Sequence, residues 1–301
     1  MAEKKSALKV HVVDVVRHGK QFVIPDGISF DEAIDLLARK RDEEEQYISI
    51  VEVINGFPWD CAIALNKAMS KLFGWVNSET GFGDNPPKLI SVETGHNTTT
   101  MVPWGSFKLP GIAGQFSCGT ASKNGKKVFQ LLAEVKRKHK LQVDEIVSLT
   151  KEFLEKESIY RGKAIAIRWL DEDGDLVEIP TPTFLDLSKV NESDIVFSDE
   201  VERSISTNLF TPIEHSDRCR ELKIPLKRGV LLSGKYGTGK TLVTYVTAAK
   251  CLRNGWTFLH CQRADELGEM VKFAHMYQPA VIFCEDIDRS INGNRTVEMD
   301  D

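Results

Sequence analysis

The sequence predicts an α/β fold with a parallel sheet over residues 195–301, preceded by an α+β region over 1–180. Three observations support this fold class. Apolar runs of strand length alternate with helical patterns in the C-terminal part, and strands that alternate with helices form parallel sheets with helices on both faces. A glycine-rich turn joins one of these runs to the next helix. The N-terminal part instead mixes helical and hairpin patterns without regular alternation.

Composition and charge are typical of a folded protein and indicate neither a membrane nor a nucleic-acid partner. Of the 301 residues, 42% are hydrophobic and 28% are charged, which suits two domains that each bury a core. The net charge of −5 gives no overall attraction to nucleic acid or anionic lipid. The start, MAEKKSALKV, lacks the apolar stretch of a signal peptide, and no apolar run has membrane-spanning length. The six cysteines lack metal-ligand spacing and indicate free thiols, so we expect a cytoplasmic protein.

The N-terminal region begins with a predicted hairpin followed by two helices. Residues 8–24 mix β-branched and polar residues around a His-Gly break, which indicates two short strands. Ser29 and Glu32 form a Ser-x-x-Glu capping box, so a helix begins there. Its apolar side continues to the acidic run at 42–45. A second helical pattern covers 58–73, with a proline in its first turn.

The remainder of this region is predicted to hold loops, a further helix and a pair of strands. Residues 74–125 are rich in Gly, Asn, Thr and Pro, which indicates loops and short strands without a definable topology. A helical pattern returns over 142–157. Strand candidates at 164–170 and 176–179 then flank an acidic turn. A Pro-Thr-Pro sequence ends regular structure, and we place a linker over 181–194.

The C-terminal region alternates helices with strands. Its elements are expected at 199–210 (helix), 229–233 (strand), 241–254 (helix), 256–261 (strand), 265–277 (helix) and 280–284 (strand). Strands connected through helices lie parallel to each other. The carboxyl ends of parallel strands share one edge of the sheet, where α/β proteins bind their ligands. The functional site is therefore expected at that edge.

The turn after the strand at 229–233 has the pattern of a phosphate-binding loop. Residues 234–241, GKYGTGKT, match G-x-x-x-x-G-K-[ST]. In this pattern the glycines let backbone N–H groups curl around the β-phosphate, the lysine neutralises the β- and γ-oxygens, and the threonine hydroxyl ligates Mg²⁺. The alternative, an ordinary glycine-rich turn, is disfavoured by the strand before it and the helix after it. The expected binding residues are Gly234, Gly237, Thr238, Gly239, Lys240 and Thr241.

Two acidic residues follow the last predicted strand. Glu285 and Asp286 come directly after the apolar run at 280–284. In nucleotide-hydrolysing sites one carboxylate holds the Mg²⁺ shell and a second orients the attacking water. By position, Glu285 would serve the metal and Asp286 would act on the water. Alone, such a pair fits a solvated turn equally well; together with the phosphate-binding loop it indicates a nucleoside triphosphate site.

Over about 195–290 the chain resembles the AAA ATPases, within the wider AAA+ class of P-loop proteins. The resemblance rests on DIVF at 194–197, PIEH at 212–215, IPLKRGVLL at 224–232, GTGKT at 237–241, ADEL at 264–267 and PAVIF at 279–283. It implies an ATPase that binds ATP and Mg²⁺, forms an oligomeric ring and remodels a macromolecular partner. Ile195 and Val196 are implied to contact the nucleotide. The N-terminal region is implied to select a protein substrate or adaptor.

Three departures from the family pattern bear on this resemblance. The family ends its second motif in Asp then Glu, whereas Glu285 precedes Asp286 here, and Asp286 is one methylene shorter than the usual base. Only GEMVKFAHMYQ separates Leu267 from Pro279, which is too short for an aromatic pore loop and a following helix. The sequence ends before the sensor strand, arginine finger and helical lid of the family. The resemblance therefore implies that 195–301 is the N-terminal part of such a domain, in which the strands at 229–233 and 280–284 have unpaired edges.

Two functions remain open on this basis. The first is an ATP-hydrolysing AAA enzyme that remodels a partner. The second is a nucleotide-binding interaction module with little or no hydrolysis, in which ATP orders an interface. Lys240 and Thr241 suit both, whereas the order of Glu285 and Asp286 favours the second.

Overall fold

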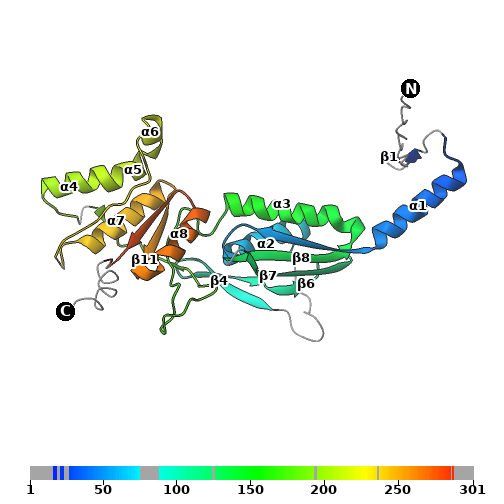
Figure 1. The fold of residues 1–301 in the computed structure, drawn as a ribbon, viewed down its shortest axis with the longest axis horizontal. Coiled ribbons are helices and arrows are strands. Elements are labelled where there is room, and N and C mark those ends of the chain that lie inside the picture. The colour runs from blue at the N-terminus through cyan, green and yellow to red at the C-terminus, as the bar shows by residue number, and fades with distance from the viewer. Residues whose placement is uncertain are drawn as a thin grey trace, which may run out of the picture.

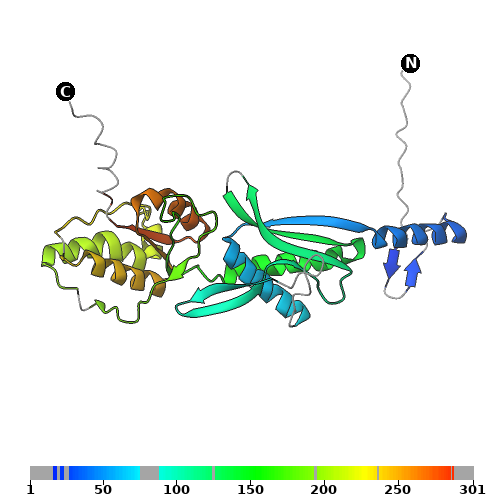
Figure 2. The same ribbon diagram turned by 90° about the horizontal axis from the view of Figure 1, so that it is seen from below.

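The structure is a computed structural model that describes residues 16–18, 21–23, 27–74, 88–123, 126–192, 195–235, 237–285 and 287. Within these residues the strands form two four-stranded sheets and two two-stranded ones. Figures 1 and 2 show an elongated molecule, in which the sheet near the C-terminus lies at one end and α1 at the other. The longer N-terminal sheet lies between them.

The N-terminal part contains ten of the described elements before its last helix pair. In order they are β1 (Val16–His18), β2 (Gln21–Val23), α1 (Phe30–Glu45), β3 (Tyr47–Ile54), α2 (Pro58–Phe73), β4 (Leu89–Gly95), β5 (Thr98–Pro103), β6 (Gly105–Phe107), β7 (Gly114–Lys123), β8 (Lys126–Lys136), the short 3₁₀ helix η1 (Arg137–His139) and α3 (Lys140–Lys156). The predicted helix at 58–73 is confirmed, and so is a helix over most of 142–157. The predicted hairpin is present as the antiparallel pair β1 and β2.

The start of α1 confirms the predicted capping box. The Ser29 hydroxyl accepts the N–H of Glu32, and the Glu32 carboxylate accepts the N–H of Ser29. This exchange satisfies two backbone donors that a helix start leaves free. Only Ala33 of the helix is buried, and Figure 1 shows α1 extending away from the N-terminal sheet. The capping box therefore stabilises a helix that has little packing of its own.

The N-terminal sheet has the antiparallel order β3-β8-β7-β6. The register pairs Tyr47 with Lys136 and Ile54 with Phe129 across β3 and β8. Helices α2 and α3 pack against each other and against β8. The apolar residues of β8 that face these helices, such as Phe129 and Leu131, are fully buried. Strands β6 and β7 of this sheet lie within residues 74–125, where the sequence predicted short strands without a topology.

The C-terminal part contains a second sheet with helices around it. Its elements are β9 (Ala164–Ala166), β10 (Thr183–Phe184), α4 (Asp199–Ile205), the π-helix η3 (Ser206–Phe210), α5 (Thr211–Glu214), α6 (Ser216–Glu221), α7 (Lys240–Arg253), β11 (Thr257–Cys261), the 3₁₀ helix η4 (Ala264–Glu266), α8 (Leu267–Met276) and β12 (Ala280–Cys284). The sheet order is β10-β9-β11-β12, in which β9, β11 and β12 are parallel and β10 is antiparallel to β9. The fold is thus mixed α/β with a parallel-strand sheet, which is compatible with a partial AAA core.

Strand pairing crosses the boundary that the sequence indicates. β9 comes from the 1–180 region and β10 from the expected linker at 181–194, yet both join the sheet of β11 and β12. β9 has three residues, Ala-Ile-Ala, of which Ala164 and Ile165 are buried. A segment this short carries no local signal for its partner. β9 lies beside β11 because its apolar residues become buried there.

The strand predicted over 229–233 is absent, and this prediction is wrong. The segment has no regular secondary structure, and Val230 and Leu231 are 42% and 79% exposed. Within the described residues no strand lies beside it. An apolar pattern gives a strand only when a neighbour pairs its N–H and C=O groups. The prediction at 164–170 and 176–179 is also too long, because only β9 and a single bridge between Leu170 and Leu176 form there.

The two faces of the C-terminal sheet have different coverings. Phe258 of β11 lies on the face covered by α7, where it packs with Ala248 and Cys251. Leu259, next in sequence, lies on the opposite face with Phe273 of α8. This second face belongs to the same hydrophobic cluster as the N-terminal core. One continuous core therefore joins the two parts of the chain.

In the described part of the chain, no helix combines the length and apolar character needed to cross a membrane. All six cysteines are free, as expected. Burial raises the pKa of Cys251 to about 12, so this thiol stays protonated at neutral pH.

Candidate functional site

The glycine-rich loop has a backbone that requires glycine at two positions. Gly237 and Gly239 have φ angles of 79° and 88°, in the left-handed region that other residues rarely adopt. The Thr238 hydroxyl donates to the Lys235 carbonyl at 2.8 Å, which closes the turn. The Lys240 ammonium donates to the carbonyls of Gly234 and Lys235, at 2.7 and 2.8 Å. The lysine side chain of the motif is therefore directed at the loop.

Helix α7 begins at this loop with free donors. Its first helical hydrogen bond runs from the N–H of Val243 to the carbonyl of Gly239, at 3.0 Å. The cap residue, Gly239, has no side chain that could accept a hydrogen bond from the helix. The N–H groups of the first turn therefore lack helical acceptors, and the helix dipole adds positive potential there. Such a helix start is suited to an anion.

The path of α7 places its start at the carboxyl edge of the sheet. A three-residue connection, 254–256, joins the end of α7 to the start of β11, and α7 packs along β11 and β12. A helix that ends at the amino edge of parallel strands and runs antiparallel to them must begin at their carboxyl edge. Glu285 follows β12 at that same edge. The fold thus brings the loop and Glu285 to one edge of one sheet.

Phe197 packs against the glycine-rich loop. A Cβ added to Gly239 would stand 3.3 Å from the Phe197 ring, so the ring lies over this glycine. Of the two predicted nucleotide-contact residues just before Phe197, Ile195 and Val196, the second is 86% exposed.

A buried lysine, missed by the sequence analysis, anchors this segment. Lys250 of α7 lies 2.9 Å from Glu192, just before the segment, and also contacts Glu214 of α5. Its ammonium stands 4.8 Å from the centre of the Phe210 ring. Arg253, one turn further on, pairs with the same Glu192. No motif marks Lys250; the only available signal is a lysine at a position of α7 that faces the core.

The acidic edge contains Glu285 and a second residue that the sequence analysis missed. The N–H of Glu285 donates to the Cys261 carbonyl at 3.1 Å, which continues the pairing of β11 and β12. His260 Nε2 lies 3.4 Å from Glu285 Oε1, within ion-pair range, but the two atoms do not meet hydrogen-bond geometry. His260 is 9% exposed. Asp286, the predicted water-activating residue, lies outside the described residues.

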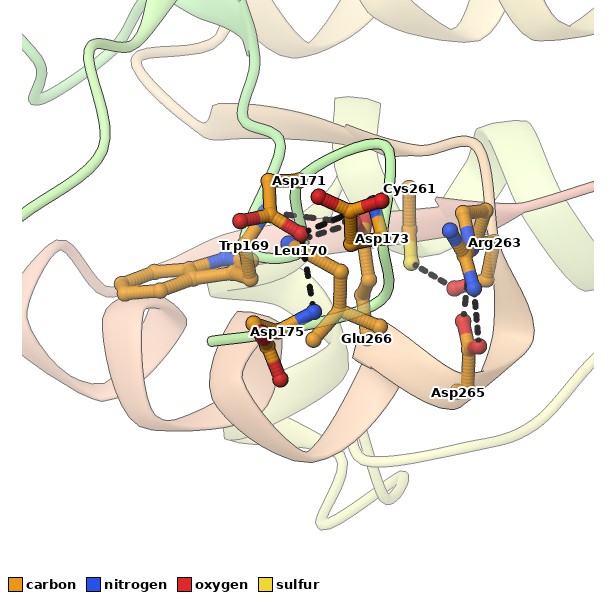
Figure 3. Close-up of polar contacts among 9 residues, drawn as sticks. All are labelled: Trp169, Leu170, Asp171, Asp173, Asp175, Cys261, Arg263, Asp265 and Glu266. Atoms are coloured by element: carbon orange, nitrogen blue, oxygen red, sulfur yellow. Dashed lines mark hydrogen bonds and ion pairs between the residues drawn. The ribbon is translucent and has the colours of Figure 1, made fainter. Parts of the chain in front are cut away.

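Other acids near this edge are occupied with structural contacts (Figure 3). Glu266 is 2% exposed, and its Oε1 accepts the N–H groups of Trp169 and Leu170 at 3.2 and 3.0 Å. Arg263 pairs with Asp265 at 2.7 Å and holds the pKa of Asp265 below its ordinary value. The Glu266 contacts connect η4, after β11, to the segment after β9, whereas the Arg263–Asp265 pair lies within the loop after β11.

The described residues contain no group of three His, Cys, Asp or Glu side chains that could hold a metal ion. The two residues that the sequence predicts as metal ligands, Thr241 and Glu285, lie in the first turn of α7 and directly after β12.

Comparison with known proteins gives partial matches. No protein-family model matches the chain. The 26S proteasome regulatory subunit 8 homolog of Schizosaccharomyces pombe is 34% identical over 93 residues, which are 28% of this chain and 23% of that protein. The 26S proteasome regulatory subunit 4 homolog of Encephalitozoon cuniculi is 30% identical over 128 residues, which are 40% of this chain and 28% of that protein. The chain spans about a quarter of the length of these relatives, and the similarity supports an AAA-type ATPase and nothing finer.

Proposed function

We propose that this chain binds ATP with Mg²⁺ at residues 234–241 and hydrolyses it as an AAA-type ATPase. The observation that carries the proposal is the loop itself, with two left-handed glycines, an inward lysine and a helix start with free N–H groups. These features together suit the β- and γ-phosphates of a nucleotide. The partial similarity to proteasome regulatory subunits supports the same family.

Each residue has a role in this proposal that its position allows. The Lys240 ammonium exchanges its bonds to the loop carbonyls for phosphate oxygens, which are charged and therefore stronger acceptors. Thr241 and Glu285 hold the Mg²⁺, which neutralises charge on the phosphates when bound. Ile195 and Val196 offer apolar surface to the nucleoside. Asp286 orients the attacking water.

The second candidate function is a nucleotide-binding interaction module with little or no hydrolysis. It is favoured by the order of Glu285 and Asp286, since a shorter carboxylate in the second position has a shorter reach to the water. We further propose that the protein assembles as a homo-oligomeric ring, and that residues 1–180 bind a protein substrate or adaptor. The continuous core between the two parts of the chain supports mechanical coupling of such a partner to the nucleotide site.

A nucleotide titration tests the binding site. Lys240→Ala should weaken ATP affinity at least tenfold, about 1.4 kcal/mol, because it removes the cation that faces the phosphates. Lys235→Ala is the matched control, since it removes a lysine side chain from a variable position of the same motif, and it should leave the affinity near that of the wild type. Equal affinities for all three proteins would refute the site.

Phosphate release then separates the two candidate functions. If the chain hydrolyses ATP, Asp286→Asn should lower turnover by about 10²–10⁴-fold with little change in ATP affinity, the pattern of a lost general base. Binding without phosphate release in the wild type would favour the interaction module. An equal loss of affinity and turnover in Asp286→Asn would contradict the role given to Asp286.

A further inference from the structure

A buried histidine nitrogen without a hydrogen-bond partner stands beside the proposed metal carboxylate. His260 is 9% exposed, and its Nε2 is one of few buried side-chain atoms in the described residues that lack a partner. Buried polar atoms are almost always paired, so an unpaired one needs an explanation. The nearest acidic atom is Glu285 Oε1, at 3.4 Å.

The strand register holds the two side chains on one face. His260 pairs in register with Phe283, and their rings are 6.2 Å apart. Phe283 packs on the face covered by α7. Because side chains alternate along a strand, Glu285, two residues after Phe283, continues on that face. His260 and Glu285 therefore converge on the side of the sheet where α7 and its phosphate-binding loop begin.

The separation of the two atoms matches two ligands of one metal ion. Ligand atoms about 2.1 Å from a metal lie about 3.4 Å apart at the tetrahedral angle and about 3.0 Å apart at a right angle. The observed 3.4 Å between Nε2 and Oε1 falls at this spacing. A hydrogen bond would instead need better alignment than these atoms have.

We propose that His260 is a second protein ligand, beside Glu285, and that this nucleotide site thereby takes a divalent transition metal such as Co²⁺ or Zn²⁺ as well as Mg²⁺. Imidazole nitrogen is a good ligand for these ions, whereas Mg²⁺ prefers oxygen. With no third acidic or nitrogen ligand among the described side chains, the phosphates and Thr241 complete the coordination. This inference rests on the proposed nucleotide function.

The test compares metal binding by the wild type and two histidine variants, each with a non-hydrolysable ATP analogue. His260→Gln should lower Co²⁺ affinity at least about tenfold and change the visible absorption of bound Co²⁺, because a nitrogen ligand is lost. Its Mg²⁺-dependent affinity for the analogue should stay close to that of the wild type. His275→Gln, an exposed residue of α8, is the matched control and should leave Co²⁺ binding unchanged.

A measurement on the unmodified chain keeps the inference testable if His260→Gln fails to fold. X-ray absorption of one equivalent of Zn²⁺, bound with the ATP analogue, should contain the outer-shell scattering of an imidazole. An oxygen-only spectrum, or a Co²⁺ affinity that is the same in the wild type and His260→Gln, overturns the role of His260. Loss of analogue binding in Lys240→Ala, together with either of these results, would leave the nucleotide site standing and remove only the metal preference.

Discussion

The glycines in and before the loop differ in whether their backbone angles and neighbouring atoms require a glycine. Gly239 has a φ of 88°, which residues with a side chain rarely adopt, and the Phe197 ring stands 3.3 Å from where a Cβ would be. Gly229, ten positions earlier, has nothing within 4 Å of an added Cβ. Of these two glycines only Gly239 belongs to the motif, so the motif accounts for a glycine at 239 and not for the one at 229.

Gly239→Ala should destabilise the loop by about 1–2 kcal/mol, because a non-glycine residue there must adopt a left-handed conformation. The added methyl also pushes on Phe197 and moves the segment at 195–197. We expect ATP affinity to fall by about tenfold, measured by titration. Gly229→Ala is the control and should leave the affinity unchanged; a similar loss in both variants would show that the loop is sensitive to any added methyl.

At this scale the sequence predicts residues that belong to a motif and misses those that do not. The roles proposed for Lys240 and Glu285 follow from their spacing within known patterns. Lys250 and His260 have no such spacing, since their partners are brought to them by packing of α5 and of β12. A contact between residues far apart in sequence leaves no local pattern.

Among the elements, α7 depends on an ionic anchor as well as on apolar packing. Lys250 is 10% exposed at its side chain and stands between Glu192 and Glu214, which are 39% and 34% exposed. The lysine side chain is shielded from water, whereas the two carboxylates are partly open to it. Its contribution therefore lies between that of a buried and a surface ion pair.

Lys250→Met keeps the length of the side chain and removes its charge. It should lower the free energy of unfolding by about 1–2 kcal/mol, because two carboxylates lose their cation. It should also weaken ATP binding, since Glu192 no longer holds the 195–197 segment at the loop. Denaturant unfolding measures the first effect. Lys272→Met, which removes a 49% exposed partner of Glu269, should change stability by less than about 0.5 kcal/mol.

Helix positions were the most predictable elements and strand pairings the least. The helices at 58–73 and 240–253 agree with their sequence patterns, because capping and apolar periodicity are local properties. Residues 229–233 have the composition of a strand without its structure, because the described chain provides no neighbour for them. β9 lies within the strand predicted over 164–170, but only its three residues form a strand, where β11 pairs with them.

At the scale of the whole molecule, a buried carboxylate holds the segment that leads from the N-terminal part to the C-terminal part. Asp60 at the start of α2 is 1% exposed and accepts the Ser158 hydroxyl at 2.5 Å and the N–H of Ile159 at 2.9 Å. The next residues reach the C-terminal part, where Arg161 donates to the carbonyls of Met276 and Gln278. These two carbonyls lie at the end of α8 and within its connection to β12, the strand that Glu285 follows.

Asp60 should make the stability of this junction depend on pH. Burial raises the pKa of Asp60 above its ordinary value of 3.8, although hydrogen bonds from Ser158 and Ile159 oppose the shift. A folded-state pKa above the unfolded value means that the folded state holds the proton more tightly. Stability from this group is therefore full below pH 3.8 and is lost as pH rises through the raised pKa.

Asp60→Asn keeps the shape of the side chain and removes its titration. Relative to this variant, the wild type should lose stability as pH rises above 3.8 and through the raised pKa of Asp60, as measured by urea unfolding at each pH. Asp217→Asn, at a side chain that is 91% exposed, should give a flat difference over the same range. A flat difference for Asp60→Asn would show that its carboxyl titrates alike in the folded and unfolded chains.

The sequence by itself determined the helix starts, the glycine-rich turn before α7 and the acids that follow β12, because each depends on residues within a few positions of one another. The tertiary structure decided which strands pair, that β9 and β10 join the C-terminal sheet, and that His260 meets Glu285. These outcomes depend on which apolar surfaces bury each other. Because the burial of each segment depends on the apolar surfaces of all the others, the strand pairing cannot be derived from any single stretch of sequence.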